Sequence, residues 1–90
     1  MTTVDFDLIS NDPADLSESV EQTRHALAAL SGVRIDSGPT RHYTFPTLPR
    51  SEQWRVTMYV AKQGRATTWN DVYTTVNGLH PGHAPCYRRR

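Results

Sequence analysis

The stretch of residues 54–61 constrains the fold most, because its apolar and polar positions alternate. Strict alternation with β-branched and aromatic residues is typical of a β-strand that has two different faces. Both faces carry apolar bulk, which favours a central strand rather than an edge strand. The two faces consist of Trp54, Val56, Met58 and Val60, and of Arg55, Thr57, Tyr59 and Ala61.

A second alternating stretch, residues 3–9, predicts another strand near the N-terminus. Its apolar face has Asp5 and Asp7 on the opposite side. We expect these aspartates to meet water or an arginine of a neighbouring strand, for which Arg55 is one candidate.

A helix is predicted over residues 13–31, because Asp12 suits an N-cap and Pro13 suits the first helical position. Gly32 is the expected end of the helix. A second helix is predicted from Thr68 to Gly78, with Asp71 as a reciprocal cap. The apolar positions of the two helices are Leu16, Val20, Leu27, Leu30, Trp69, Val72, Tyr73 and Val76.

The segment between the first helix and the 54–61 strand contains four residues that form turns or interrupt strands, namely Gly38, Pro39, Pro46 and Pro49. We expect a short strand at 33–35, a turn or bulge at 37–39 and an edge strand at 41–45. Residues 48–53 are expected to form a connection. Residues 80–90 are predicted to form a final strand or a basic tail.

The chain is therefore predicted to be one small α+β domain, residues 1–90, with the order β-α-β-β-α(-β). We expect an antiparallel-rich mixed sheet with both helices on one face. This element order resembles the ferredoxin-like split β-α-β plan. The resemblance implies that strands 3–9 and 54–61 lie at the centre, and we expect them to pair in parallel.

The composition of the chain indicates its cellular compartment more than its function. Hydrophobic residues make up 37% of the chain and charged residues 21%, which is typical of a globular domain. The single cysteine excludes an internal disulfide, so we expect a cytoplasmic protein. No apolar run approaches the length of a membrane span, and the acidic N-terminus does not resemble a signal peptide. We therefore expect no membrane partner.

A non-catalytic binding or regulatory protein is the leading functional hypothesis, with a protein partner or a second copy as the ligand. An accessory or inhibitor protein would fit this size. Residues 1–32 have a net charge of −5 and residues 33–90 a net charge of +6, and such asymmetry can orient a partner. Aromatic and arginine residues left over from the core are typical interface anchors. The predicted partner patch is Tyr43, Phe45, Arg55, Tyr59, Tyr87 and Arg88.

Two alternatives remain open at this point. The first is a nucleic-acid-binding domain with a basic, aromatic sheet face, although the first strand is acidic. The second is a small metal- or thiol-dependent enzyme that uses His80, His83 and Cys86. A fourth ligand would have to come from elsewhere, so we predict no metal site, no cofactor and no catalytic residue.

Overall fold

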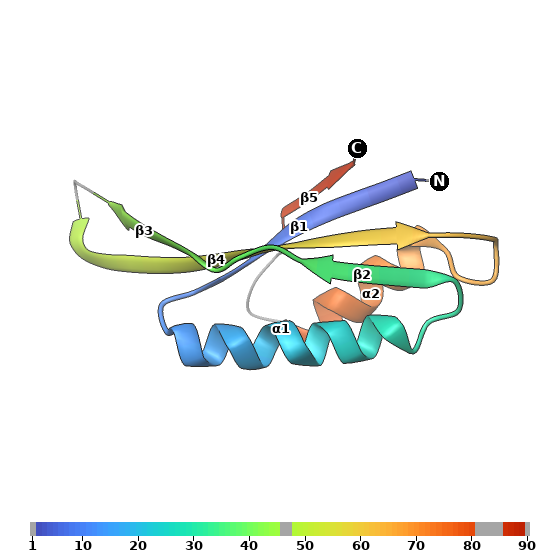
Figure 1. The fold of residues 1–90 in the computed structure, drawn as a ribbon, viewed down its shortest axis with the longest axis horizontal. Coiled ribbons are helices and arrows are strands. Elements are labelled where there is room, and N and C mark those ends of the chain that lie inside the picture. The colour runs from blue at the N-terminus through green and yellow to red at the C-terminus, as the bar shows by residue number, and fades with distance from the viewer. Residues whose placement is uncertain (1, 46–47, 81–85, 90) are drawn as a thin grey trace.

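The computed structural model describes the backbone of residues 2–45, 48–80 and 86–89, and the side chains of residues 3–42 and 53–80. It forms one antiparallel sheet with both helices on the same face (Figure 1). This is the predicted ferredoxin-like α+β fold. The elements are β1 (Thr2–Ser10), α1 (Pro13–Ala28), β2 (Val33–Ser37), β3 (Arg41–Phe45), β4 (Leu48–Lys62), α2 (Trp69–Leu79) and β5 (Cys86–Arg89).

The sheet runs in the order β2-β4-β1-β5, and β3 pairs with the same strand β4 as β2 does. The two central strands, β1 and β4, were expected to be parallel, and this was wrong. They are antiparallel, with register from Thr2 opposite Lys62 to Ser10 opposite Trp54. The reason is geometric: α1 returns the chain so that β2 runs parallel to β1, and the following hairpin reverses it again. Every pairing between the described strands is antiparallel, so the sheet is not mixed.

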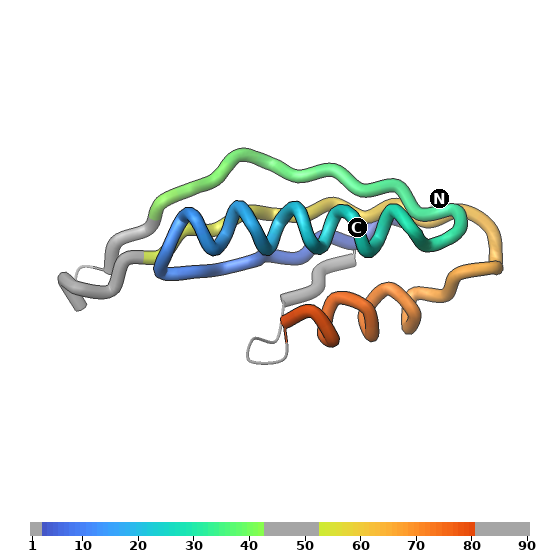
Figure 2. The backbone as a smooth tube through the Cα atoms, turned by 90° about the horizontal axis from the view of Figure 1, so that it is seen from below, coloured from blue at the N-terminus to red at the C-terminus, as the bar shows by residue number. Residues whose placement is uncertain are grey.

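The hydrophobic core lies between the sheet and the two helices. The helices lie side by side on one face of the sheet, the face toward the viewer in Figure 2. The apolar face of the predicted central strand is confirmed, because Met58 and Val60 are fully buried and Val56 nearly so. Phe6 of β1 and Leu27 of α1 are fully buried against them. Each such side chain contributes about 1.5–3 kcal/mol when it leaves water. Among the described residues, this one-sided core leaves the opposite face of the sheet without a helical layer.

Local sequence signals explain the helix boundaries. Asp12 accepts a hydrogen bond from the backbone N–H of Ala14 (2.9 Å) at the start of α1. The predicted end at residue 31 was too late: α1 ends at Ala28, because the Leu30 amide bonds the Leu27 carbonyl (3.1 Å) and tightens the chain into a turn. Gly32 completes that turn with a left-handed φ of 72°.

The cap of α2 is confirmed as predicted. The Thr68 amide donates to Asp71 (2.8 Å), and the Asp71 amide donates to the Thr68 hydroxyl (3.2 Å), which forms a reciprocal capping box. Neither helix has an apolar stretch of the length needed to cross a lipid bilayer, within the residues described.

Strands β2 and β3 form one interrupted edge along β4. The break at residues 38–40 falls where a turn or bulge was predicted, and the Gly38 amide still bonds the Thr57 carbonyl (2.9 Å). Residues 48–53 were expected to be a connection, and this was wrong: they are strand, because β3 extends far enough to pair with them. We call β3 with residues 48–53 of β4 the arm; it reaches beyond the end of α1 (Figure 1).

Candidate functional site

The open face of the sheet, on the side away from the helices, carries the other half of the alternating strands. Its described charged side chains are balanced, with three arginines and three aspartates at register positions on β1, β2, β3 and β4. Ile9 is the large hydrophobic side chain exposed there, among the residues whose side chains are described. The described part of this face is therefore polar. Its charged residues are Asp5, Asp7, Arg34, Asp36, Arg41 and Arg55.

Asp7 of β1 lies at the centre of a polar cluster on this face, because it contacts both Thr57 and Arg55. The Thr57 hydroxyl donates a 2.7 Å hydrogen bond to Asp7 Oδ1, and Arg55 Nη1 lies 3.9 Å from Asp7 Oδ2. This confirms the expectation that Arg55 meets an aspartate of β1. The aspartates do not simply face water, since Asp7 is 9% exposed and Asp5 is 2% exposed. Their burial follows from the strands on both sides of β1.

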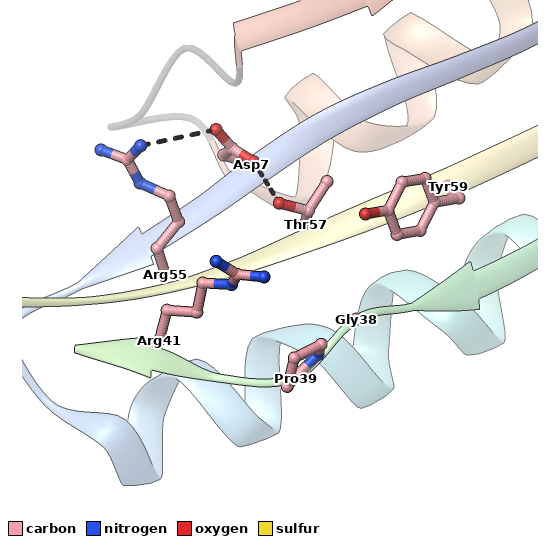
Figure 3. Close-up of a pocket in the computed structure, with 7 residues that line it drawn as sticks. All are labelled: Asp7, Gly38, Pro39, Arg41, Arg55, Thr57 and Tyr59. Carbon is pink, nitrogen blue, oxygen red and sulfur yellow. Dashed lines mark hydrogen bonds and ion pairs between the residues drawn. The ribbon is translucent and has the colours of Figure 1, made fainter. Parts of the chain in front are cut away.

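A hollow of about 170 Å³ lies beside this cluster, where the break after β2 leaves room above β4. Figure 3 shows the Arg41 guanidinium and the Tyr59 hydroxyl extending toward the same space, while Arg55 turns toward Asp7. Gly38 helps to leave this space, because a Cβ there would lie 3.6 Å from the Tyr59 ring. The hollow is lined by Asp7, Gly38, Pro39, Arg41, Arg55, Thr57 and Tyr59.

Two residues of the predicted partner patch, Arg55 and Tyr59, meet in this hollow. The other four have described backbones, whereas their side chains lie outside the described residues. Two of these are on the arm and two are on β5, at the far edge of the sheet. Their register partners are Gln53 for Tyr43, Leu48 for Phe45, Phe6 for Tyr87 and Asp5 for Arg88.

Tyr87 therefore occupies a different strand position from Tyr59. Its partner Phe6 belongs to the core face, whereas Asp5, the partner of Arg88, also pairs with Tyr59. Arg88 and Tyr59 thus share the register partner Asp5, whereas the register partner of Tyr87 is Phe6. The role of the six residues as a patch stays a prediction.

His80, one of the three candidate metal ligands, has a different contact. Its Nε2 lies 2.9 Å from the hydroxyl of Thr23, which is fully buried on α1. That hydroxyl already donates to the Ser19 carbonyl (2.7 Å), so His80 Nε2 is the donor of the pair. No group of three potential metal ligands occurs among the described residues. His83 lies outside them, as does the side chain of Cys86.

Arg41 and Gly38 were missed by the sequence analysis as site residues. A signal was present, because the Gly38-Pro39 break separates two stretches that alternate like strands. An interruption opposite a central strand leaves space on the sheet, and residues next to it line that space.

Comparison with known proteins gives the fold and no family. No protein-family model matches the chain, and no curated protein matches it. CutA1 from Pyrococcus horikoshii is similar in structure, with a TM-score of 0.52, 14% identity, and coverage of 100% of this chain and 81% of that chain. The de novo designed protein Ferredog-Diesel has a TM-score of 0.55 and 9% identity, covering 99% and 82%.

A Bordetella bronchiseptica protein described as a candidate antibiotic biosynthesis monooxygenase has a TM-score of 0.55 and 13% identity, covering 99% and 93%. At these identities the likeness concerns the fold alone. Because proteins with such different descriptions share this fold, the fold does not determine the function, which has to be inferred from the residues of the site.

Proposed function

We propose that this chain is a small, non-catalytic binding protein that associates with a second copy of itself through the arm and the adjoining open sheet face. The arm is the observation that supports this. Pairing between β1 and β4 ends at Ser10 and Trp54, so residues 48–53 have β3 as their neighbour among the described strands. A two-stranded ribbon is marginally stable in water without further packing.

The dimensions of the fold also favour a partner for the arm. Helix α1, with 16 residues, is about 24 Å long. The longest dimension of the molecule is 46 Å. The six residues 48–53 add about 20 Å of strand, which neither helix can cover. The arm therefore offers backbone donors and acceptors along an edge of β4.

A second copy is the simplest occupant of that edge. Two identical edges can pair antiparallel around a two-fold axis, so that the backbone N–H and C=O groups of each edge bond those of the other. Tyr43 and Phe45 lie on β3 of the arm and are the proposed aromatic anchors. The single cysteine is consistent with a cytoplasmic setting, which forms part of the proposal.

Nucleic-acid binding receives less support than self-association. Three arginines and three aspartates share the described open face, so it has no net positive charge to attract phosphates. A metal-dependent enzyme also receives less support, because His80 is engaged by Thr23. A gel shift that weakens steeply with salt would reverse this order of preference.

The test is the mass of the protein in solution across a concentration series. Sedimentation equilibrium should give a species of twice 10.2 kDa at high concentration. Replacing both arm aromatics (Tyr43→Ser with Phe45→Ser) should shift the equilibrium to monomer without changing the melting temperature measured at low concentration. Asn70→Ser, which changes an exposed residue of α2 on the other face of the sheet, is the matched control and should leave the mass unchanged. A monomeric wild type at every concentration would contradict the proposal.

A further inference from the structure

The hollow on the open face has an unbalanced charge that self-association through the arm does not explain. It is lined by two arginines, Arg41 and Arg55, and by one carboxylate, Asp7. Arg55 is paired with Asp7 at 3.9 Å. No ion pair joins Arg41 to a carboxylate among the described residues. The hollow thus has one cation in excess, and that cation is exposed.

The two arginines also oppose each other directly across β3 and β4, because Arg41 pairs with Arg55 in the register. Like charges at directly opposed positions destabilise an antiparallel pair. Asp7, at 3.9 Å from Arg55, offsets the charge of that arginine. An anion held beside Arg41 would offset the charge that remains, and Figure 3 shows that its guanidinium extends over the hollow.

We infer that this hollow is a binding site for the carboxylate of a small organic acid, held by Arg41 and bordered by Tyr59. A planar guanidinium presents parallel N–H groups that match the two oxygens of a carboxylate. The phenol at Tyr59 adds a polar group at the opposite side of the space. The excess of one positive charge matches a monoanion better than a phosphate dianion.

The size of the hollow restricts the ligand further. Its volume of about 170 Å³ is well below the ~300–1,000 Å³ of pockets that enclose drug-sized molecules. The Gly38 amide is not available as a donor, because it bonds the Thr57 carbonyl. Gly38 instead lines the hollow without a side chain that would occupy it. A carboxylate with a short carbon chain therefore suits the site.

The experiment is an NMR titration of the isotope-labelled chain with sodium acetate, using sodium chloride at equal ionic strength as the reference. Acetate should shift the amide signals of residues 38–41 and 57–59 in a saturable manner. Arg41→Gln should weaken this binding by about tenfold or more, because the charge-assisted hydrogen bonds are lost. Arg34→Gln is the matched control: it removes an exposed arginine of β2 that does not line the hollow, and it should leave the affinity unchanged.

Asp7→Asn provides an independent check, because it raises the charge of the lining from one excess cation to two. It should tighten acetate binding and improve the affinity for inorganic phosphate more than that for acetate. The inference is overturned if acetate causes no saturable shift, or if Arg34→Gln weakens binding as much as Arg41→Gln. Tighter binding of phosphate than acetate to the wild type would also overturn the assignment of a monoanion. Sedimentation of the same samples measures self-association independently, so that a failure of acetate binding can be told apart from a failure of self-association.

Discussion

The hydrogen bond from Thr57, rather than the ion pair with Arg55, is predicted to hold the buried carboxylate of Asp7. The donor and acceptor are 2.7 Å apart, and Asp7 is 9% exposed. A hydrogen bond to a charged group contributes about 1.5–3 kcal/mol. The substitution Thr57→Val keeps the shape of the side chain and removes the donor. We therefore expect it to lower the free energy of unfolding by about 1.5–3 kcal/mol.

The ion pair should contribute less for two structural reasons. The closest atoms of Arg55 and Asp7 are 3.9 Å apart, and the Arg55 side chain is 33% exposed. Two unit charges at that distance attract by about 4 kcal/mol at an effective dielectric constant near 20, before solvent screening is counted. Partly exposed pairs retain ~0.2–1 kcal/mol in measured cycles. The coupling between Asp7→Asn and Arg55→Met should fall in that range.

Urea unfolding of the single and double variants measures both effects, provided that the slope of free energy against urea stays constant. Thr3→Val, on the same sheet face and without a side-chain hydrogen bond among the described contacts, controls for the general effect of a valine in a strand. The ion-pair coupling should shrink in high salt, whereas the Thr57 effect should not. A Thr57→Val cost smaller than the Asp7–Arg55 coupling would refute this ranking.

Three further predictions concern the helix ends. The backbone hydrogen bond from Thr68, followed by its side-chain hydrogen bond, lowers the pKa of Asp71 below its ordinary value of 3.8. The capping contribution should therefore be present above that pH and lost as pH falls through the lowered pKa, so wild type and Asp71→Asn should converge in stability in acid. Gly32→Ala should destabilise by at least ~1 kcal/mol, because the residue is left-handed and a Cβ would clash with the Gln63 carbonyl. Gly78→Ala should instead stabilise α2 by ~0.5–1 kcal/mol, since nothing lies within 4 Å of the added Cβ. Thermal unfolding by circular dichroism checks the last two, and unfolding at several pH values checks the first.

Local patterns were sufficient to predict the layers of this fold. The period of two in β1 and β4 indicates which side chains are buried, and the Thr68 capping box is a short-range signal that the structure confirms. The direction of the β1–β4 pairing was not a local property. It depends on how many times the chain reverses between the two strands, and the prediction failed there.

The candidate site was harder to predict because its residues are distant in sequence. Asp7 and Thr57 are 50 positions apart, and their contact depends on a register that alternation alone does not determine. Arg41 becomes a site residue through its pairing with Arg55, which depends on how far β3 extends past the Gly38 break. The arm was missed for the same reason, since residues 48–53 become strand by pairing with β3 rather than by their own pattern.

Amide hydrogen exchange along residues 50–53 tests the proposed self-association most directly. These amides belong to the arm, beyond the last residue of β4 that pairs with β1. Because successive N–H groups of a strand point to alternate sides, the amides in this range that point away from β3 report on the open edge. If a second copy covers that edge, their exchange should slow as protein concentration rises, while exchange at the core residue Met58 stays slow throughout. Fast exchange of these edge-facing amides at every concentration, with Met58 still protected, would contradict association through the arm.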